Sequence, residues 1–292
     1  MKILLLLALT LSAVFAKMNV AVAYPYIEQL THEIAKDRVD ITLLSRGAWD
    51  PHFVVPKPSL IAGLRNADLL IVNGASLEIG WMPPLVNNAN NAKIRPNAKG
   101  YLDLSQYIEL QDIPKSVNRS MGHVHEEGNP HFVLDPHNII KLAEVVMLKL
   151  SLLDAPHKAF YQNNFKIFKV HWQKKLKVYD KKMRKCKGMM VVQYHELFNY
   201  FLRRYDIQSL DNLEPLPGIS PSTKHTMELI TNIPKNKVKY IIQDVYHEHK
   251  TASFIAKKTD AKVIELPHDV GALKSVKTLD DFYDTLVNIT CK

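Results

Sequence analysis

Cysteine is scarce in this chain of 292 residues, and its two copies, Cys186 and Cys291, lie far apart in the sequence. Zinc fingers and disulfide-dense scaffolds need several closely spaced cysteines, so both classes are excluded. Whether the two thiols pair depends on the compartment in which the chain folds, because disulfides persist only in oxidising surroundings.

Long hydrophobic runs are also missing, apart from Ile3 to Leu11 near the start, which is too short to span a bilayer. Lys2 precedes this run, and Val14-Phe15-Ala16 suits the cleavage positions of an export signal. No cysteine follows the run at a lipid-attachment position. We therefore expect residues 1–16 to be a signal peptide, the mature chain to be exported and soluble, and Cys186 to pair with Cys291.

Motifs for covalent chemistry are absent from the sequence. The metalloprotease helix motif needs a second histidine four residues after the first, but His125-Glu126 and His195-Glu196 both reach an asparagine there. There is no Gly-x-Ser-x-Gly elbow and no glycine loop for phosphate. We expect a protein that is not an enzyme.

Acidic residues are fewer than basic ones, with 29 Asp and Glu against 38 Lys and Arg, giving a formal charge of +9. Much of the excess lies in residues 166–187, where lysines alternate with apolar residues. This pattern indicates a solvated helix face more than a nucleic-acid surface. Because no nucleic-acid motif or aromatic-interleaved basic loop accompanies it, no nucleic-acid partner is expected.

Short apolar runs alternate with helical stretches along the chain, which predicts an α/β fold with parallel sheets and helical crossovers. The expected strands are residues 19–24, 39–44, 68–72, 101–104, 189–193, 240–243 and 262–266. The expected helices are residues 27–36, 58–66 with Ser59 as N-cap, 75–88 broken by Pro83-Pro84, 135–153, 156–184, 197–205, 222–232, 251–259 and 279–289.

The longest predicted helix, from Pro156 to Arg184, divides the chain. At ~1.5 Å per residue it would be roughly 40 Å long, enough to brace two domains. We expect two parallel-sheet lobes with helices on both faces, joined by this helix. The boundaries are 1–16 for the signal peptide, 17–155 for the N-terminal lobe, 156–185 for the linking helix and 186–292 for the C-terminal lobe.

Three histidines stand at or just beyond the ends of predicted strands or in a loop before a helix: His52 in Asp50-Pro51-His52, His131 in Asn129-Pro130-His131, and His195. Ligand sites in parallel sheets lie beyond the carboxyl ends of the strands. Neutral imidazole is the commonest protein ligand for metals, and zinc prefers a tetrahedral set of such donors. The pattern predicts one metal site between two lobes.

A fourth donor is less clearly marked by the sequence. The strand at residues 262–266 ends in Leu266-Pro267-His268-Asp269, and either His268 or Asp269 can enter the site. A second group, His123 and His125 with Glu126-Glu127, is either a weak collector of metal or a solvated loop.

The ordered set of motifs resembles the zinc- and manganese-specific solute-binding proteins of ABC importers. The resemblance covers nearly the whole mature chain. In the N-terminal half it rests on Asp50-Pro51-His52, Pro58-Ser59, Ala67-Asp68-Leu69, Asn73-Gly74, Glu78, Trp81, Pro130-His131 and Leu134-Asp135-Pro136. In the second half it rests on Tyr194-His195, Phe198, Tyr200, Tyr205, Pro217-Gly218 and Pro221-Ser222.

The resemblance implies a metal in the cleft between two lobes, held by His52, His131, His195 and an acidic fourth ligand at Asp269, with His268 as the alternative. Histidine at the third position favours Zn²⁺, whereas manganese members have glutamate there, so Mn²⁺ is the second candidate. It implies a monomeric periplasmic receptor that delivers zinc to a membrane permease. The rival classes are a zinc-dependent hydrolase and a metal-carrying adhesin.

Overall fold

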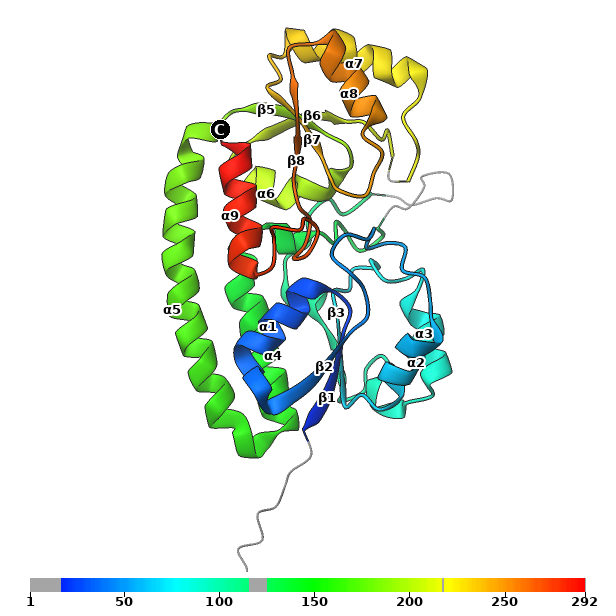
Figure 1. Cartoon of the computed structure of the whole chain (residues 1–292), viewed down its shortest axis with the longest axis vertical. Helices are drawn as coiled ribbons and strands as arrows, with labels where there is room; N and C mark the ends of the chain where they lie inside the picture. Colours follow the sequence, from blue (N-terminus) through cyan, green and yellow to red (C-terminus); the bar gives the residue numbers. More distant parts are fainter. Residues whose placement is uncertain (1–16, 116–124, 217, 292) are drawn as a thin grey trace, which may run out of the picture.

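The computed structural model describes residues 17–291 except 116–124 and 217, so the predicted signal peptide and His123 lie outside the described residues. Within the described ranges the strands form two four-stranded parallel sheets, one from each half of the chain (Figure 1). The α/β architecture that the sequence predicts is confirmed.

The first sheet has the strand order β2-β1-β3-β4. Its strands are β1 (Met18–Val22), β2 (Val39–Leu43), β3 (Leu69–Val72) and β4 (Tyr101–Asp103). Helices α1 (Pro25–Ala35) and α4 (Asn138–Leu153) lie on one side of it, and α2 (Pro58–Arg65) and α3 (Met82–Ala89) lie on the other (Figure 1). With both faces covered, all four residues of β3 are buried, as in other parallel sheets.

The second sheet has the order β6-β5-β7-β8. Its strands are β5 (Met190–Gln193), β6 (Gln208–Asn212), β7 (Tyr240–Gln243) and β8 (Lys262–Glu265), with helices α6 (Asn199–Arg204), α7 (Thr223–Lys235) and α8 (Lys250–Lys258). The sequence did not predict β6. It is an edge strand in which no residue is fully buried, so it carries no apolar run to reveal it.

Two details of the predicted helices are wrong. Ser59 is not the N-cap of α2, because Lys57 occupies that position and Pro58 opens the first turn. Residues 75–88 are not one broken helix: residues 75–81 form turns, and α3 starts only at Met82. Pro83 and Pro84 sit in its first turn, where a missing N–H removes no helical hydrogen bond.

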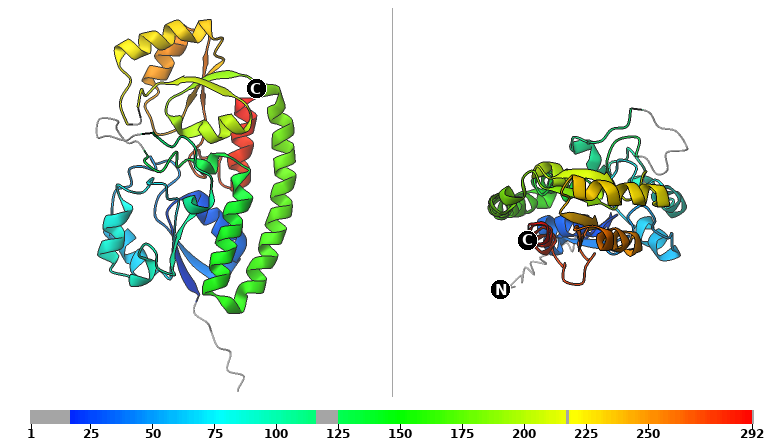
Figure 2. Two further views of the ribbon diagram at one scale, coloured as in Figure 1. Left: turned by 180° about the vertical axis from the view of Figure 1, so that it is seen from behind. Right: turned by 90° about the horizontal axis from the view of Figure 1, so that it is seen from above.

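The long helix α5 (Lys158–Met183) runs along both lobes at one edge of the molecule (Figures 1 and 2). Its 26 residues make it roughly 39 Å long. No helix in the described ranges, this one included, is long and apolar enough to cross a membrane. The long linking helix expected from the sequence is present as α5, and it lies outside both sheets.

The C-terminal helix α9 (Leu279–Thr290) is fastened beside α5. The contacts are His171 Nε2 with Asp280, Lys175 Nζ with Asp284 Oδ2 at 2.8 Å, and Lys182 Nζ with Asn288 Oδ1 at 2.9 Å. At the end of this seam a disulfide joins Cys186 to Cys291, with Cα atoms 5.9 Å apart. The predicted pairing of the two cysteines is confirmed.

Aromatic side chains connect this seam to the loop that follows His131. Trp172 of α5 packs edge-on against Tyr283 of α9, with ring centroids 5.2 Å apart. The Trp172 indole N–H donates to the Pro136 carbonyl at 2.8 Å, and the Tyr283 hydroxyl donates to the Val133 carbonyl. The long helix thus fixes the backbone beside one of the candidate ligands.

We expect the disulfide to contribute substantially to stability, because it closes a loop with a sequence separation of 105 residues. Replacing Cys186 and Cys291 together by alanine should lower the free energy of unfolding by about 2–4 kcal/mol, as measured by denaturant titration. The reduced parent protein is the matched control and should show a similar loss. Two titratable thiols in denatured, unreduced protein would contradict the pairing.

Candidate metal centre

Side chains of His52, His131 and His195 converge between the two sheets. Each offers one ring nitrogen, and the three nitrogens lie within 4.8 Å of one another. Ring centroids are 5.3 Å apart for His52 and His131, and 5.6 Å apart for His195 with each of the others. The first two come from loops of the N-terminal half, and His195 follows β5 of the second sheet.

Two of these imidazoles present nitrogen atoms that the protein leaves unsatisfied. Among the described residues, Nε2 of His131 and Nε2 of His195 are buried and have no hydrogen-bond partner. Such orphaned polar atoms cost stability and are rare in folded proteins. Lone pairs from several imidazoles that meet in a buried space fit a divalent cation of the zinc type, which can satisfy all of them at once.

Protonation also favours metal binding at His131. Burial lowers the pKa of His131 well below its usual value, and the neighbouring His52 and His195 lower it further. The ring therefore stays neutral, which is the form that binds a metal ion.

His52 is oriented by the carboxylate two residues before it. Asp50 Oδ1 lies 2.7 Å from Nδ1 of His52 and also accepts from the His52 backbone N–H at 2.9 Å. Burial alone would raise the pKa of Asp50, but the hydrogen bonds and charge of His52 bring it below the usual range. Because Nδ1 donates to this carboxylate, Nε2 is the nitrogen left for a metal.

The loop that carries His52 is held in place by two aromatic residues. Tyr24 donates its hydroxyl to the Pro51 carbonyl at 2.9 Å, and Trp81 donates its indole N–H to the same oxygen at 3.2 Å. Both side chains are buried, and their rings meet edge-on. The backbone next to His52 is thereby fixed before any ligand arrives.

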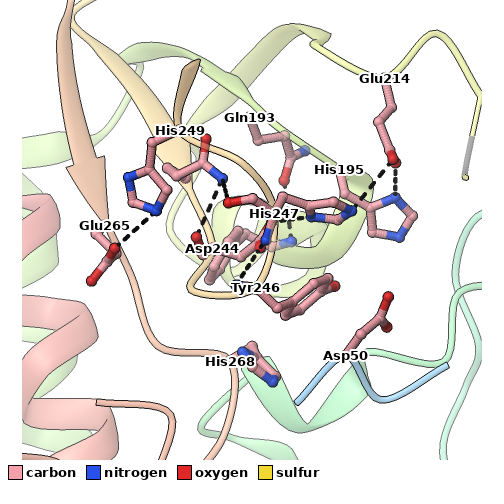
Figure 3. A network of polar contacts seen from close by, with 12 residues as sticks. Asp50, Gln193, His195, Glu214, Asp244, Tyr246, His247, His249, Glu265 and His268 are labelled. Atoms are coloured by element: carbon pink, nitrogen blue, oxygen red, sulfur yellow. Dashed lines mark hydrogen bonds and ion pairs between the residues drawn. The ribbon is translucent and has the colours of Figure 1, made fainter. Parts of the chain in front are cut away.

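His195 belongs to a chain of polar contacts that Figure 3 shows. Its Nδ1 lies 2.9 Å from Glu214 Oε2 (Figure 3), and Glu214 Oε1 lies 3.4 Å from Nε2 of His247. The other nitrogen of His247, Nδ1, is 2.8 Å from Asp244 Oδ2. Glu214 therefore turns Nε2 of His195 toward the other two histidines.

Charges within this chain compensate one another. Although burial opposes ionisation of Glu214, its contacts with His195 and His247 lower its pKa to about 2. Burial would likewise lower the pKa of His247, but Asp244 and Glu214 raise it to about 9. The carboxylate behind His195 is thus ionised, and a protonated His247 balances it from the side away from the cluster.

The sequence did not reveal Glu214 or the role of His247. Glu214 follows the unpredicted strand β6, 19 residues beyond His195, so nothing in the linear pattern links the two. His247-Glu248-His249 comes directly before α8, which begins at Lys250, and nothing in the sequence distinguishes a site there from the entry to a helix. His249 faces away and pairs with half-buried Glu265, as Figure 3 shows, whereas His247 faces Glu214.

Asn129 ties the His131 loop to the second half of the chain. Its Oδ1 accepts from the His131 backbone N–H at 2.9 Å, while its Nδ2 donates to the Glu196 carbonyl at 2.9 Å. The Tyr200 hydroxyl donates to the Asn129 carbonyl at 2.9 Å. An aspartate at position 129 could also accept the hydrogen bond from the His131 backbone N–H. When ionised, however, it would have no hydrogen to donate to the Glu196 carbonyl.

A fourth imidazole, His125, stands beside the three. Its Nε2 is 3.2 Å from Nε2 of His52, and the two rings are stacked with centroids 5.2 Å apart. The ring of His131 lies 5.9 Å from it. One member of the short His-Glu cluster predicted at residues 123–127 therefore lies beside the site.

Asp269 and His268 are both buried but differ in what they contact. Asp269 Oδ1 accepts from the Val270 backbone N–H at 2.6 Å, the Tyr26 backbone also donates to the carboxylate, and burial raises its pKa. Its oxygens are not among the donor atoms that lie within 4.8 Å of one another in the described residues. The structure brings the three histidines together, whereas the hydrogen bonds of Asp269 go to Val270 and to Tyr26 of α1.

His268 keeps one nitrogen available. Its Nε2 donates to the Trp49 carbonyl at 3.1 Å, so Nδ1 carries the lone pair, and Nδ1 is buried without a partner among the described residues. Burial lowers the pKa of His268 to about 4, so the ring is neutral.

We expect Glu214 to strengthen metal binding without touching the metal. Glu214→Ala should weaken zinc affinity about 10–100-fold, because His195 loses the group that fixes its tautomer and orientation. Glu214→Gln should retain part of the affinity, since an amide oxygen still accepts from Nδ1. The matched control is Glu265→Ala, which removes a half-buried carboxylate paired with His249 in the same lobe. Equal affinities for Glu214→Ala and the parent protein, measured by competition with a chelator, would contradict this role.

Comparison with known proteins places the chain in a family. The family model ZnuA, described as "Zinc-uptake complex component A periplasmic", matches residues 20–290. The zinc-binding lipoprotein AdcA of Streptococcus pneumoniae is 25% identical over 247 residues, covering 84% of this chain and 49% of AdcA. The chain therefore spans about half the length of that relative.

A second relative matches over most of its length. The metal ABC transporter substrate-binding lipoprotein SloC of Streptococcus mutans is 24% identical over 297 residues, covering 97% of this chain and 94% of SloC. Among solved structures, a crystal structure of ZnuA superposes with a TM-score of 0.78 at 21% identity, covering 94% of this chain and all of that one. The chain belongs to the family of the periplasmic component A of zinc-uptake complexes, a family of solute-binding receptors and not of enzymes.

Proposed function

We propose that this protein is an exported receptor that captures Zn²⁺ in the periplasm and delivers it to the membrane permease of an ABC importer. The observation that carries the proposal is the convergence of His52, His131 and His195 from both halves of the chain. The unsatisfied Nε2 atoms of His131 and His195 support it, because a captured cation would give both nitrogen lone pairs a partner. The metal is cargo, so the same geometry has to bind it and release it.

Donor chemistry favours zinc over manganese. Imidazole nitrogen suits zinc, whereas Mn²⁺ prefers carboxylate and other oxygen ligands. The three atoms that converge are all nitrogens, and both nearby carboxylates, Asp50 and Glu214, are engaged by histidine Nδ1 atoms. A manganese receptor remains the second candidate, since an ionised Asp269 would add an oxygen donor.

A hydrolytic role has little support at this site. A zinc hydrolase keeps an open coordination position and a general base beside it. Asp50 and Glu214 could serve as bases only by giving up the histidines that they orient. Protein purified without added metal, analysed for bound metal and then titrated with zinc and manganese, tests the receptor against these alternatives. Retention of the fold after metal removal, with reversible rebinding, would argue against an adhesin with a structural metal.

Release requires that the ligands separate. His52 and His131 belong to one lobe and His195 to the other, so a small shift of the second sheet would remove one donor and weaken the site. The seam between α5 and α9 limits such a motion, because it fastens the two halves along one edge. We propose a short displacement in place of wide hinge opening.

We expect His52→Ala, His131→Ala and His195→Ala each to weaken zinc binding by orders of magnitude, because each removes one direct donor. Calorimetry or chelator competition measures the affinity, and thermal unfolding of the metal-free variants checks the fold. His171→Ala is the matched control, since that histidine is half exposed and pairs with Asp280 on the far edge of the molecule. A variant with the affinity of the parent would remove its residue from the site.

For the fourth ligand we propose Asp269, as the family resemblance implies. A carboxylate would reduce the net charge of a dication bound by neutral imidazoles, which favours binding in a buried space. To reach the metal, Asp269 has to exchange its hydrogen bonds with Val270 and Tyr26 for the cation and to lose the proton that burial favours. His268, with its unsatisfied Nδ1, is the competing donor.

Paired substitutions distinguish these two donors. If Asp269 is the ligand, Asp269→Asn should reduce zinc affinity by about tenfold or more, and His268→Gln should reduce it much less. A tenfold loss of affinity corresponds to about 1.4 kcal/mol of binding free energy. Both changes nearly preserve volume, so each is the control for the other. The reverse order of effects would replace the proposed aspartate by a shell of four histidines, while the proposed receptor function would stand.

A further inference from the structure

The outer face of α5 carries a concentration of positive charge that the metal site does not use. Residues 158–187 contain eleven Lys and Arg and a single acid, Asp180. The formal charge of this segment alone therefore exceeds the +9 of the whole chain. The segment lies at the edge of the molecule, with both lobes on its other side (Figures 1 and 2).

The charges on this helix are arranged by face. Its buried side is made of Tyr161, Phe165, Phe168, Trp172, Tyr179 and Met183. Exposed lysines recur on the opposite side at helical spacings of three and four, with Val170 in the same row. We call this row the basic stripe; it comprises Lys166, Lys174, Lys177, Lys181 and Lys185.

Lysines at the margins of α5 are already engaged, whereas those of the stripe are not. Lys175 and Lys182 bind α9, and Lys187 pairs with Asp206. Asp180, the segment's one acid, lies 2.9 Å from His137 Nε2. In the described ranges, no lysine of the basic stripe takes part in an ion pair or hydrogen bond. Among the described residues, no ion pair therefore offsets their mutual repulsion along the helix.

Aliphatic side chains accompany the stripe. Ile167, Val170 and Val178 are 63%, 54% and 48% exposed on this solvent-facing side of α5. Lysine ammonium groups are compact point charges without the planar fork by which arginine recognises individual phosphates. No aromatic ring is exposed on this helix for a base to stack on. Diffuse positive charge with interspersed aliphatic groups fits an anionic lipid surface better than nucleic acid.

We propose that the basic stripe, with Ile167, Val170 and Val178, binds the surface of an anionic phospholipid bilayer. The helix axis lies parallel to the membrane, the ammonium groups contact lipid phosphates, and the aliphatic side chains enter the headgroup layer. The contact is electrostatic and reversible, so it weakens as salt screens the charges. It is independent of the proposed metal ligands and would confine the receptor to two dimensions beside its permease.

Vesicle co-sedimentation of the full mature chain tests the proposal. We expect binding to vesicles of phosphatidylglycerol mixed with phosphatidylcholine at low salt, loss of binding at high salt, and no binding to pure phosphatidylcholine. Each basic residue near an anionic surface contributes on the order of fivefold to partitioning. The variant Lys174→Glu, Lys177→Glu, Lys181→Glu should therefore lose binding by about a hundredfold or more.

The matched control reverses three exposed lysines of α7 and α8, as Lys235→Glu, Lys257→Glu, Lys258→Glu, which changes the net charge equally. It should retain most of the binding. Zinc affinity and circular dichroism should be unchanged in both variants, which separates this test from the metal site. Equal losses in the two variants, or no binding to the anionic vesicles, would overturn the proposal.

A third variant separates a bilayer from a soluble polyanion. Ile167→Ser with Val170→Ser keeps every charge, so it should weaken vesicle binding several-fold and leave retention on heparin unchanged. If this variant binds vesicles as tightly as the parent, the stripe is a general polyanion surface and the membrane assignment is wrong.

Discussion

The structure depends on one constraint: the buried Nε2 atoms of His131 and His195, one from each half of the chain, converge without a hydrogen-bond partner among the described residues. The protein meets it by engaging the opposite nitrogen of the ring wherever a carboxylate is within reach, Asp50 for His52 and Glu214 for His195. Each carboxylate fixes a tautomer, and the lone pairs are thereby directed into the same space. The cost of leaving Nε2 of His131 and Nε2 of His195 without a partner favours the binding of a divalent cation there.

Much of the surrounding architecture serves to hold these rings still. Tyr24 and Trp81 both donate to the Pro51 carbonyl, and Asn129 bonds to the backbone of both halves of the chain. Gly47 illustrates how closely the loops approach, because a Cβ at that position would lie 1.9 Å from the Val270 carbonyl oxygen. Loops from opposite ends of the chain are thus in close backbone contact at this position.

The sequence predicted the parts of this arrangement that obey local rules. The apolar runs of the strands predicted both parallel sheets, and positions at the ends of strands indicated His52 and His195 as ligands. It could not predict β6, whose residues are largely solvated, or the pairing of Glu214 with His195, which exists only once β5 and β6 lie side by side. The pair Pro83-Pro84 was also ambiguous. The sequence predicts a break within a helix there, whereas the two prolines lie in the first turn of α3. Predicting such long-range contacts requires the tertiary structure. The same holds for deciding whether a proline pair starts or ends a helix.

The disulfide between Cys186 and Cys291 has a topological consequence. The chain enters the second sheet immediately after Cys186 and reaches Cys291 at the end of α9, so the whole second lobe is a covalent ring hanging from the end of α5. A protease that cuts one loop of that ring opens it but releases no fragment. The two pieces of the cut chain stay joined by the disulfide. A nicked receptor would therefore keep both halves of its binding site until a reductant cleaved that bond.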